Sequence, residues 1–284
     1  MSGDAELAVC AIFRDEAPYL AEWLAFHRLV GVERFFLYDN RSTDRWLEAI
    51  EQSGCADIVT MTPWPFEPGQ GPAYQHCLQT HGARARWIAF IDCDEFLFVT
   101  DGGDLRAALQ PYASHPALAV NWLEYGSSGL RRRPDGPVTR HYTRRGPIDV
   151  VIGAPGLERA PGLDPNDPAS YRPQFTHIKS VVQPARTLRP LTPHAFAYRD
   201  GARAVTEEGR PVEGSWSDQV SVQRFRINHY WSKSLEELAA KVARGFATGA
   251  KLSLSTAQAK ERLLNEEIDT AIFPIARRLP GWRL

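Results

Sequence analysis

The sequence has no long apolar run and no paired-cysteine motif. No segment reaches the roughly 18 uninterrupted apolar residues that a membrane span needs, and Asp4 and Glu6 stand where a secretion signal would carry positive charge. The 4 cysteines are widely spaced and include no Cys-x-x-Cys pair, which fits neither a disulfide framework nor a zinc cluster. We therefore expect an unexported, cytoplasmic protein with reduced thiols.

The sequence also lacks an excess of positive or of negative side chains. The 284 residues include 33 Lys plus Arg and 34 Asp plus Glu, for a formal net charge of -1. This balance argues against a protein that coats nucleic acid through its overall charge. No internal repeat occurs, and the length suits one large domain. We expect a single domain over residues 1–250, followed by a helical tail over 251–284.

Short apolar runs alternate with helix-like stretches over the first hundred residues. Residues 7–13 are apolar and partly β-branched, as in a strand covered on both faces. The helix that follows should begin at an N-cap, Asp15, and end near Gly31. Further strands are expected at 34–38, 56–61 and 87–91, with helices at 45–52 and 73–81. This βαβαβαβ order predicts an α/β fold, with a mostly parallel central sheet and helices on both faces.

Beyond residue 101 the alternation weakens. Ser234 and Glu237 have the spacing of a capping box, which predicts a helix from there to about Gly245. Residues 131–170 are dense in Pro, Gly, Arg and Asp and are expected to form a long functional loop. The remaining elements expected from the pattern are a helix at 104–112, strands at 117–123 and 220–231, and a last helix at 256–271.

An acidic motif follows the fourth predicted strand, where Asp92-Cys93-Asp94 succeeds an apolar run. Side chains two apart along a strand point the same way, so both carboxylates should share one face. Carboxylate oxygens suit Mg²⁺ or Mn²⁺, and ligands of open α/β sheets bind beyond the carboxyl ends of the strands. We expect a divalent-metal site here; the alternative is that the acids only cap the following turn.

Polar groups also follow the first two predicted strands. Arg14-Asp15-Glu16 comes after the first strand, and a polar turn from Asp39 to Asp44 comes after the second. A carboxylate at such a strand end can accept a hydrogen bond from a nucleobase or a ribose hydroxyl. Asp39 is the preferred candidate for that contact, whereas Asp15 and Asp44 suit helix N-caps at least equally well.

Several motifs stand in a specific order along the chain. They are residues 13–20 with Glu22-Trp23 and Phe26-His27, Tyr38-Asp39-Asn40 with Ser42-Thr43-Asp44, residues 90–97, Tyr125-Gly126-Ser127-Ser128-Gly129, and His229-Tyr230-Trp231-Ser232-Lys233-Ser234. In this order they resemble glycosyltransferase family 2-like and family 92-like proteins, over roughly residues 8–245. The resemblance implies a GT-A fold and an inverting sugar transfer, usually from a UDP-sugar. Residues 1–100 would form the nucleotide-binding half and 101–250 the acceptor half.

The resemblance also implies roles for individual residues. Asp39 would contact the uracil or the ribose, and Asp92 the ribose or the metal. Asp94 would bind Mn²⁺ or Mg²⁺, with His229 as a further metal ligand. The other residues expected to bind the nucleotide-sugar are Arg14, Glu16, Gln70, Tyr74, Gly126, Lys179 and Lys233.

An inverting displacement needs a general base beside the acceptor hydroxyl. Glu124 and Asp218 are the candidates, with Glu124 preferred. The acceptor is expected to be a saccharide or a lipid-linked saccharide, and Trp122, Trp216 and Trp231 could serve as platforms for a sugar ring.

The segment from Arg131 to Arg145 holds six arginines and a single acid. Such a segment could bind an anionic acceptor or the inner face of a membrane, and the alternative is a solvated loop. His177 and His194 flank Lys179 and are further candidate site residues.

Two other functions stay open at the level of sequence. A phosphotransferase of the haloacid dehalogenase type also uses Asp-x-Asp after an apolar strand, but it requires Thr or Val where this chain has Phe96. The other alternative is a saccharide- or nucleotide-binding module of the same fold without catalysis.

Overall fold

The computed structural model describes residues 5–148, 174–247, 249 and 251–282. Within this part of the chain a ten-stranded sheet forms the centre of the molecule. Its strands are β1 (Ala5–Phe13), β2 (Arg34–Asp39), β3 (Val59–Pro63), β4 (Ala85–Phe90), β5 (Glu95–Val99), β6 (Ala117–Glu124), β8 (Ile178–Val182), β11 (Ala204–Val205), β12 (Pro211–Val212) and β13 (Phe225–His229).

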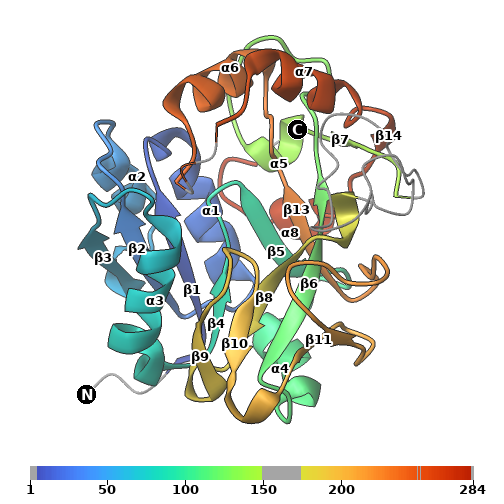
Figure 1. Ribbon diagram of the computed structural model, residues 1–284. Coiled ribbons are helices and arrows are strands. Elements are labelled where there is room, and N and C mark those ends of the chain that lie inside the picture. The colour runs from blue at the N-terminus through green and yellow to red at the C-terminus, as the bar shows by residue number, and fades with distance from the viewer. Residues whose placement is uncertain (1–4, 149–173, 248, 250, 283–284) are drawn as a thin grey trace.

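The strand order is β12-β11-β6-β8-β4-β1-β2-β3, with β13 beside β6 and β5 beside β13 (Figure 1). β3, β2, β1 and β4 run parallel to one another, whereas β8 lies antiparallel between β4 and β6. The predicted α/β class with a mostly parallel sheet is therefore confirmed. No helix in the described part of the chain is both long and apolar enough to cross a bilayer.

Helices cover both faces of the sheet because the side chains of each strand alternate in direction. In β1, Leu7, Val9 and Ala11 face one apolar core with α1, while Ala8 and Cys10 face a second core with α3. The helices are α1 (Ala17–Leu29), α2 (Trp46–Gln52), α3 (Gln70–His81), α4 (Leu105–Leu109), α5 (Val138–His141), α6 (Leu235–Arg244), α7 (Leu254–Arg262) and α8 (Phe273–Ala276).

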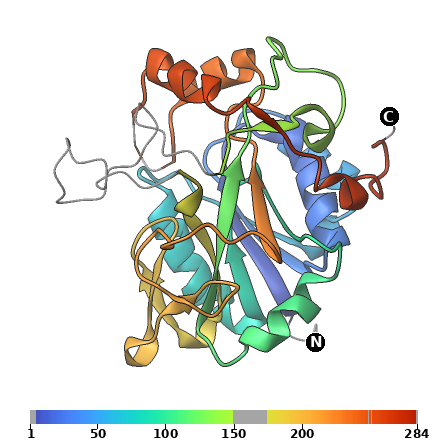
Figure 2. The same cartoon turned by 90° about the vertical axis from the view of Figure 1, so that its right-hand side faces the viewer.

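Helices α6 and α7 lie across one end of the sheet, above the carboxyl ends of the parallel strands (Figures 1 and 2). The predicted capping box begins α6: the Ser234 hydroxyl accepts from the N–H of Glu237, and the Glu237 carboxylate accepts from the N–H of Ser234. Gly245, with a φ of 83°, ends the helix. Local sequence therefore suffices to place this helix in the chain.

The first helix begins differently from its prediction. Asp15 is not its N-cap, because Asp15 has a φ of 54° and its carboxylate accepts from the N–H of Thr43. The carboxylate of Asp44 instead accepts from the N–H of Ala17 at 2.7 Å. An acid from the neighbouring strand end therefore satisfies the first turn of α1.

The predicted single helix over 256–271 is wrong. α7 ends at Arg262, and β14 (Glu267–Ile268) pairs with β7 (Arg144–Arg145). The Asp269 carboxylate accepts at 2.7 Å from both Arg145 and Arg226, and these bonds hold the chain extended there. Leu264, Ile275 and Trp282 are then buried in the core that β1 and α1 share.

A buried neutral histidine links α1 to the start of β5. The ring of His27 donates from Nδ1 to the carbonyl of Trp23 at 2.8 Å, and its Nε2 accepts from the N–H of Leu97 at 3.1 Å. Burial lowers the pKa of His27 to about 3. A proton on Nε2 would face the N–H of Leu97, so the folded state requires the neutral ring.

We expect His27 to make folding sensitive to acid. Between pH 6.5 and 3 the unfolded chain binds a proton that the folded chain does not, so stability should fall as pH falls, by up to about 1.4 kcal/mol per pH unit. Urea unfolding at several pH values would measure this slope. His27→Gln should be less stable at pH 7 but flatter between pH 6.5 and 4; an unchanged slope would contradict the assignment.

Candidate functional site

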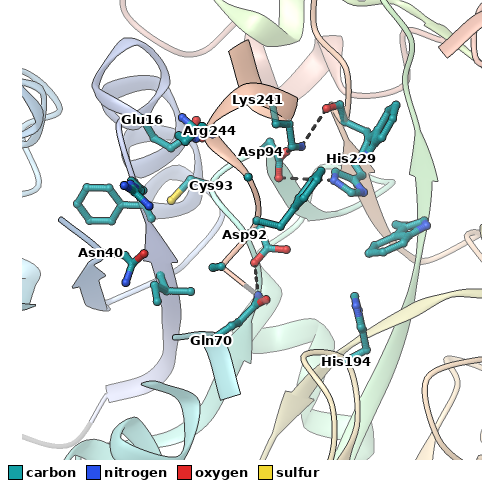
Figure 3. A pocket seen from close by; sticks show the side chains of 18 of the residues that line it. Glu16, Asn40, Gln70, Asp92, Cys93, Asp94, His194, His229, Lys241 and Arg244 are labelled. Atoms are coloured by element: carbon teal, nitrogen blue, oxygen red, sulfur yellow. Dashed lines mark hydrogen bonds and ion pairs between the residues drawn. The ribbon is translucent and has the colours of Figure 1, made fainter. Parts of the chain in front are cut away.

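A pocket of about 300 Å³ opens where the carboxyl ends of β1, β4, β6 and β13 meet, beneath α6 and α7 (Figure 3). Parallel strands bring their following residues to this one edge, which is where α/β sheets bind ligands. Several residues predicted from the sequence line this pocket: Arg14, Glu16, Gln70, Asp92, Asp94, Glu124 and His229.

Asp92 is held by three side chains from other elements. Its Oδ1 accepts from Nε2 of Gln70 at 2.8 Å and from the Tyr74 hydroxyl at 3.4 Å, and its Oδ2 accepts from Nζ of Lys179 at 2.8 Å. Gln70 and Tyr74 were both expected at the nucleotide site. They orient Asp92 from α3, and Gln70 itself lines the pocket.

Lys179 lies fully buried beneath the acidic motif. Its ammonium group is 2.8 Å from Asp92 and 3.4 Å from Glu95. Burial disfavours the charged ammonium, yet these carboxylates outweigh it and raise the pKa of Lys179. Glu95 also accepts from the N–H of Asp92 at 2.9 Å. Lys179 and Glu95 thus fix the turn that carries both acids of the motif.

Asp94 points to a different part of the pocket from Asp92. Its Oδ2 accepts from Nζ of Lys241 at 2.6 Å, and its Oδ1 lies 3.6 Å from Nε2 of His229. Burial opposes ionisation, but Lys241 and His229 keep the pKa of Asp94 well below its usual range. The motif occupies a turn between β4 and β5, not a strand, so its two carboxylates have separate partners.

The donors around Asp94 fit a divalent ion that completes its shell with ligand oxygens and water. Burial lowers the pKa of His229, so its imidazole is neutral and can ligate a metal. Mg²⁺ is commonly held by one or two protein groups together with substrate phosphates. Within the described residues, no group of three or more His, Cys, Asp or Glu is arranged to hold a metal. The protein could therefore supply Asp94 and His229, while Asp92 is engaged elsewhere.

Glu124 ends β6 on the same side of the pocket as His229. Its Oε1 accepts from Nζ of Lys260 at 2.8 Å and lies 3.6 Å from Nδ1 of His229. Its Oε2 is buried without a hydrogen-bond partner in the part of the chain that the structure describes. The ammonium group of Lys260 lies 4.2 Å from the centre of the Trp231 ring, which also lines the pocket. One carboxylate oxygen of Glu124 therefore has its hydrogen-bonding capacity unused among the described residues.

Glu16 and Arg14 form the opposite wall. The Glu16 carboxylate accepts from Arg244 at 2.6 Å, while Arg14 makes a longer contact of 3.4 Å to Glu67. Lys233 does not line the pocket; it lies behind Glu16 at 3.8 Å, over the ring of Tyr19. Lys233 therefore adds positive charge behind this wall.

Three predicted site residues lie outside the pocket lining in addition to Tyr74, Lys179 and Lys233. The Asp39 carboxylate accepts from the N–H of Ser42 inside its own turn, and the neighbouring Asn40 lines the pocket instead. Asp218 belongs to a separate, shallow cavity beside Arg210. Gly126 packs against the segment that follows α7.

Arg144 and Arg145 of the arginine-rich segment make contacts within the protein. Arg145 pairs with Glu267 at 2.6 Å and with Asp269 at 2.7 Å, and Arg144 donates to the carbonyl of Asn265 at 3.2 Å. These two arginines brace the chain after α7. The part of the predicted loop from 149 to 170 lies outside the described residues.

Sequence reasoning missed the cations of the C-terminal helices. Lys241 and Arg244 on α6, and Lys260 on α7, all line the pocket. The available signal was the spacing of Lys241 and Arg244, which places two cations on one face of a predicted helix. Nothing in the sequence indicates that this face lies over the strand ends.

The fold and the pocket define an α/β protein whose ligand site combines acids from strand ends with cations from helices. A family model, glycosyltransferase family 92, matches residues 5–148. The chain belongs to this family.

The matching relatives are longer proteins. A family 92 protein of Ricinus communis is 32% identical over 145 residues, which is 49% of this chain and 26% of the relative. One from Oryza sativa is 33% identical over 143 residues, with 49% and 24% covered. The match thus spans about a quarter of these relatives. Among solved structures, S. aureus TarS 1–349 in complex with UDP has a TM-score of 0.40 at 12% identity, covering 91% of this chain and 70% of that one.

Substitution of Gly126 would test whether the glycine-rich segment has a packing role. A Cβ at this position would lie 2.5 Å from the carbonyl oxygen of Leu264 and 2.6 Å from the amide of Asn265. We expect Gly126→Ala to lower the free energy of unfolding by about 1–3 kcal/mol, as overpacking does. Urea denaturation would measure the change.

The matched control is Gly71→Ala in α3, where, apart from its own stretch of helix, no heavy atom of the described residues lies within 4 Å of the added Cβ. This variant should be close to neutral, because the helical preference of alanine is offset by Pro72, which disfavours the helical conformation of the residue before it. Equal stability of the two variants would contradict the packing role of Gly126.

Proposed function

We propose that this chain transfers a sugar, with inversion, from a nucleoside diphosphate sugar to a saccharide or lipid-linked acceptor, and that a UDP-sugar is the donor. The observation that carries the proposal is the charge arrangement around the pocket. Asp94 and Glu124 on strand ends face Lys241 and Lys260 on the helices, at 2.6 and 2.8 Å. Membership of glycosyltransferase family 92 supports the same reaction class.

The two kinds of charge suit the two parts of such a donor. A diphosphate leaving group carries negative charge that increases as its bond to the sugar breaks, and fixed cations in a pocket stabilise that charge. Carboxylates at strand ends can accept from sugar and ribose hydroxyls. A pocket of about 300 Å³ lies within the range of small-ligand sites.

Asp94 and His229 are the residues that would hold Mn²⁺ or Mg²⁺. When bound, the ion would act as a Lewis acid toward the diphosphate. In this assignment Asp92 keeps its contacts with Gln70 and Lys179 and serves the ribose instead of the ion.

Glu124 is the residue best placed to act as general base. In a single displacement the acceptor hydroxyl oxygen bonds to the anomeric carbon, its proton passes to a carboxylate, and the bond from the sugar to the diphosphate breaks. Within residues 5–148, 174–247, 249 and 251–282, Oε2 of Glu124 has no hydrogen-bond partner, and it could take that proton. Trp122 and Trp231 line the same side, where their rings could pack on a sugar.

Removing the charge of Asp94 should disrupt donor binding. Asp94→Asn keeps the shape of the side chain, and we expect it to weaken UDP binding in the presence of Mn²⁺ by at least about tenfold, since loss of even a supporting group costs that much. Isothermal titration calorimetry would measure the affinity. Asp101→Asn, an exposed acid beyond the far end of β5, is the control and should bind normally. Wild-type affinity in Asp94→Asn would contradict the assignment.

Replacing the proposed base should slow turnover without loss of the donor. Glu124→Gln should reduce kcat for Mn²⁺-stimulated hydrolysis of UDP-glucose by about 10²–10⁴-fold, the usual contribution of a general base, while UDP affinity stays near wild type. Asp218→Asn is the comparison and should retain activity. A loss confined to Asp218→Asn would transfer the role to Asp218. Nucleotide binding with no turnover of any donor would favour a non-catalytic module.

A further inference from the structure

Two cations of α6 reach the pocket from outside the region that the family model matches. Lys241 and Arg244 stand three residues apart on one face of the helix. Figure 3 shows their side chains above the strand ends, directed toward Asp94 and Glu16. The family model ends at residue 148, so it assigns no role to either cation.

Each of these cations is bound to one acid and still borders the pocket. Nζ of Lys241 lies 2.6 Å from Oδ2 of Asp94, and Nη2 of Arg244 lies 2.6 Å from Oε1 of Glu16. Their side chains keep 17% and 26% of their exposure, whereas that of Lys179 keeps none. A charge at the wall of a pocket can exchange its partner for an anionic ligand, but one sealed beneath the site cannot.

Both acids have a second partner besides their cation on α6. Oε2 of Glu16 is buried without a hydrogen-bond partner among the described residues and lies 3.8 Å from Nζ of Lys233. Asp94 faces His229 and, under the proposed function, the divalent ion. A carboxylate left alone after its cation moved away would be an uncompensated buried charge, which is strongly unfavourable. Lys233 beside Glu16, and the proposed ion beside Asp94, would keep these carboxylates from being left uncompensated.

We propose that Lys241 and Arg244 form the clamp for the donor diphosphate, and that they exchange Asp94 and Glu16 for phosphate oxygens when the donor binds. This inference rests on the proposed function, because it takes the donor to be a nucleoside diphosphate sugar. The guanidinium group of Arg244 can contact two phosphate oxygens at once, and the ammonium group of Lys241 supplies a compact charge.

If the Lys241–Asp94 and Arg244–Glu16 pairs had only a structural role, their loss would change ligand affinities in a different pattern. If the two pairs only fastened α6 to the sheet, their loss would lower stability without distinguishing ligands that have phosphates from ligands that lack them. UDP and uridine share the base and the ribose and differ in the diphosphate. The ratio of their affinities therefore isolates the contacts that the clamp would make.

The experiment is calorimetric titration of the full chain with UDP, uridine and inorganic pyrophosphate, each in Mn²⁺. Lys241→Met and Arg244→Met should each weaken UDP binding by about tenfold or more, the effect of losing a charge-assisted hydrogen bond. Uridine affinity should stay within about twofold by the same reasoning. Arg262→Met, on the exposed face of α7, is the matched control and should leave all affinities unchanged.

A second measurement uses the wild-type protein and avoids any failure of the variants to fold. Acetylation of lysine amines, followed by mass spectrometry, should show Lys241 protected when UDP is present, with the exposed Lys251 as the unprotected reference. Unchanged labelling of Lys241, or UDP affinity within twofold of wild type in both variants, would overturn the clamp.

The two proposals fail in different ways. If wild type binds pyrophosphate but not UDP, and the variants lose the pyrophosphate, the clamp stands and the uridine donor is wrong. If wild type binds UDP and the variants bind it equally well, the donor stands and the clamp is wrong. If wild type binds neither ligand, both proposals fall.

Discussion

The buried ammonium group of Lys179 is the interaction on which the site depends. It lies within 3.4 Å of Asp92 and Glu95, and Glu95 accepts in turn from the N–H of Asp92. A buried pair of this kind adds little net stability, but breaking it costs about 3–5 kcal/mol, so the surrounding chain keeps the geometry that preserves it. Lys179 can occupy this place because β8 lies antiparallel between β4 and β6.

Above that layer, acidic and basic side chains alternate across the pocket. The series runs Lys241, Asp94, His229, Glu124 and Lys260, with separations of 2.6 to 3.6 Å between neighbours. Several carboxylates this close together would raise one another's pKa if no cations stood between them. Lys241 and His229 hold the pKa of Asp94 well below its usual range. Under the proposed function, Lys241 and Lys260 would also supply the positive charge that an anionic donor requires.

The parts of this arrangement that depend on residues close together in the sequence could be predicted from it. Apolar runs placed β1, β2 and β4, and the Ser234 capping box placed α6. Contacts between distant segments could not be predicted: Lys241 reaches an acid 147 residues away, and Arg244 one that is 228 residues away. The helix expected over 256–271 failed for the same reason. Its propensity is overridden by the ion pairs of Asp269 and by the pairing of β14 with β7.

The near-zero net charge conceals an uneven distribution of the pocket's acids and cations along the chain. Glu16, Asp92, Asp94 and Glu124 all lie within residues 5–148, the part that the family model matches, where Arg14 is the pocket-lining cation among the described residues. The positive charge comes later, from Lys179, Lys241, Arg244 and Lys260. A pocket built from the matched part alone would repel a diphosphate, because like charges in a partly buried site are poorly screened. Under the proposed function, the later segments convert an acidic sheet edge into a site that can accept an anion.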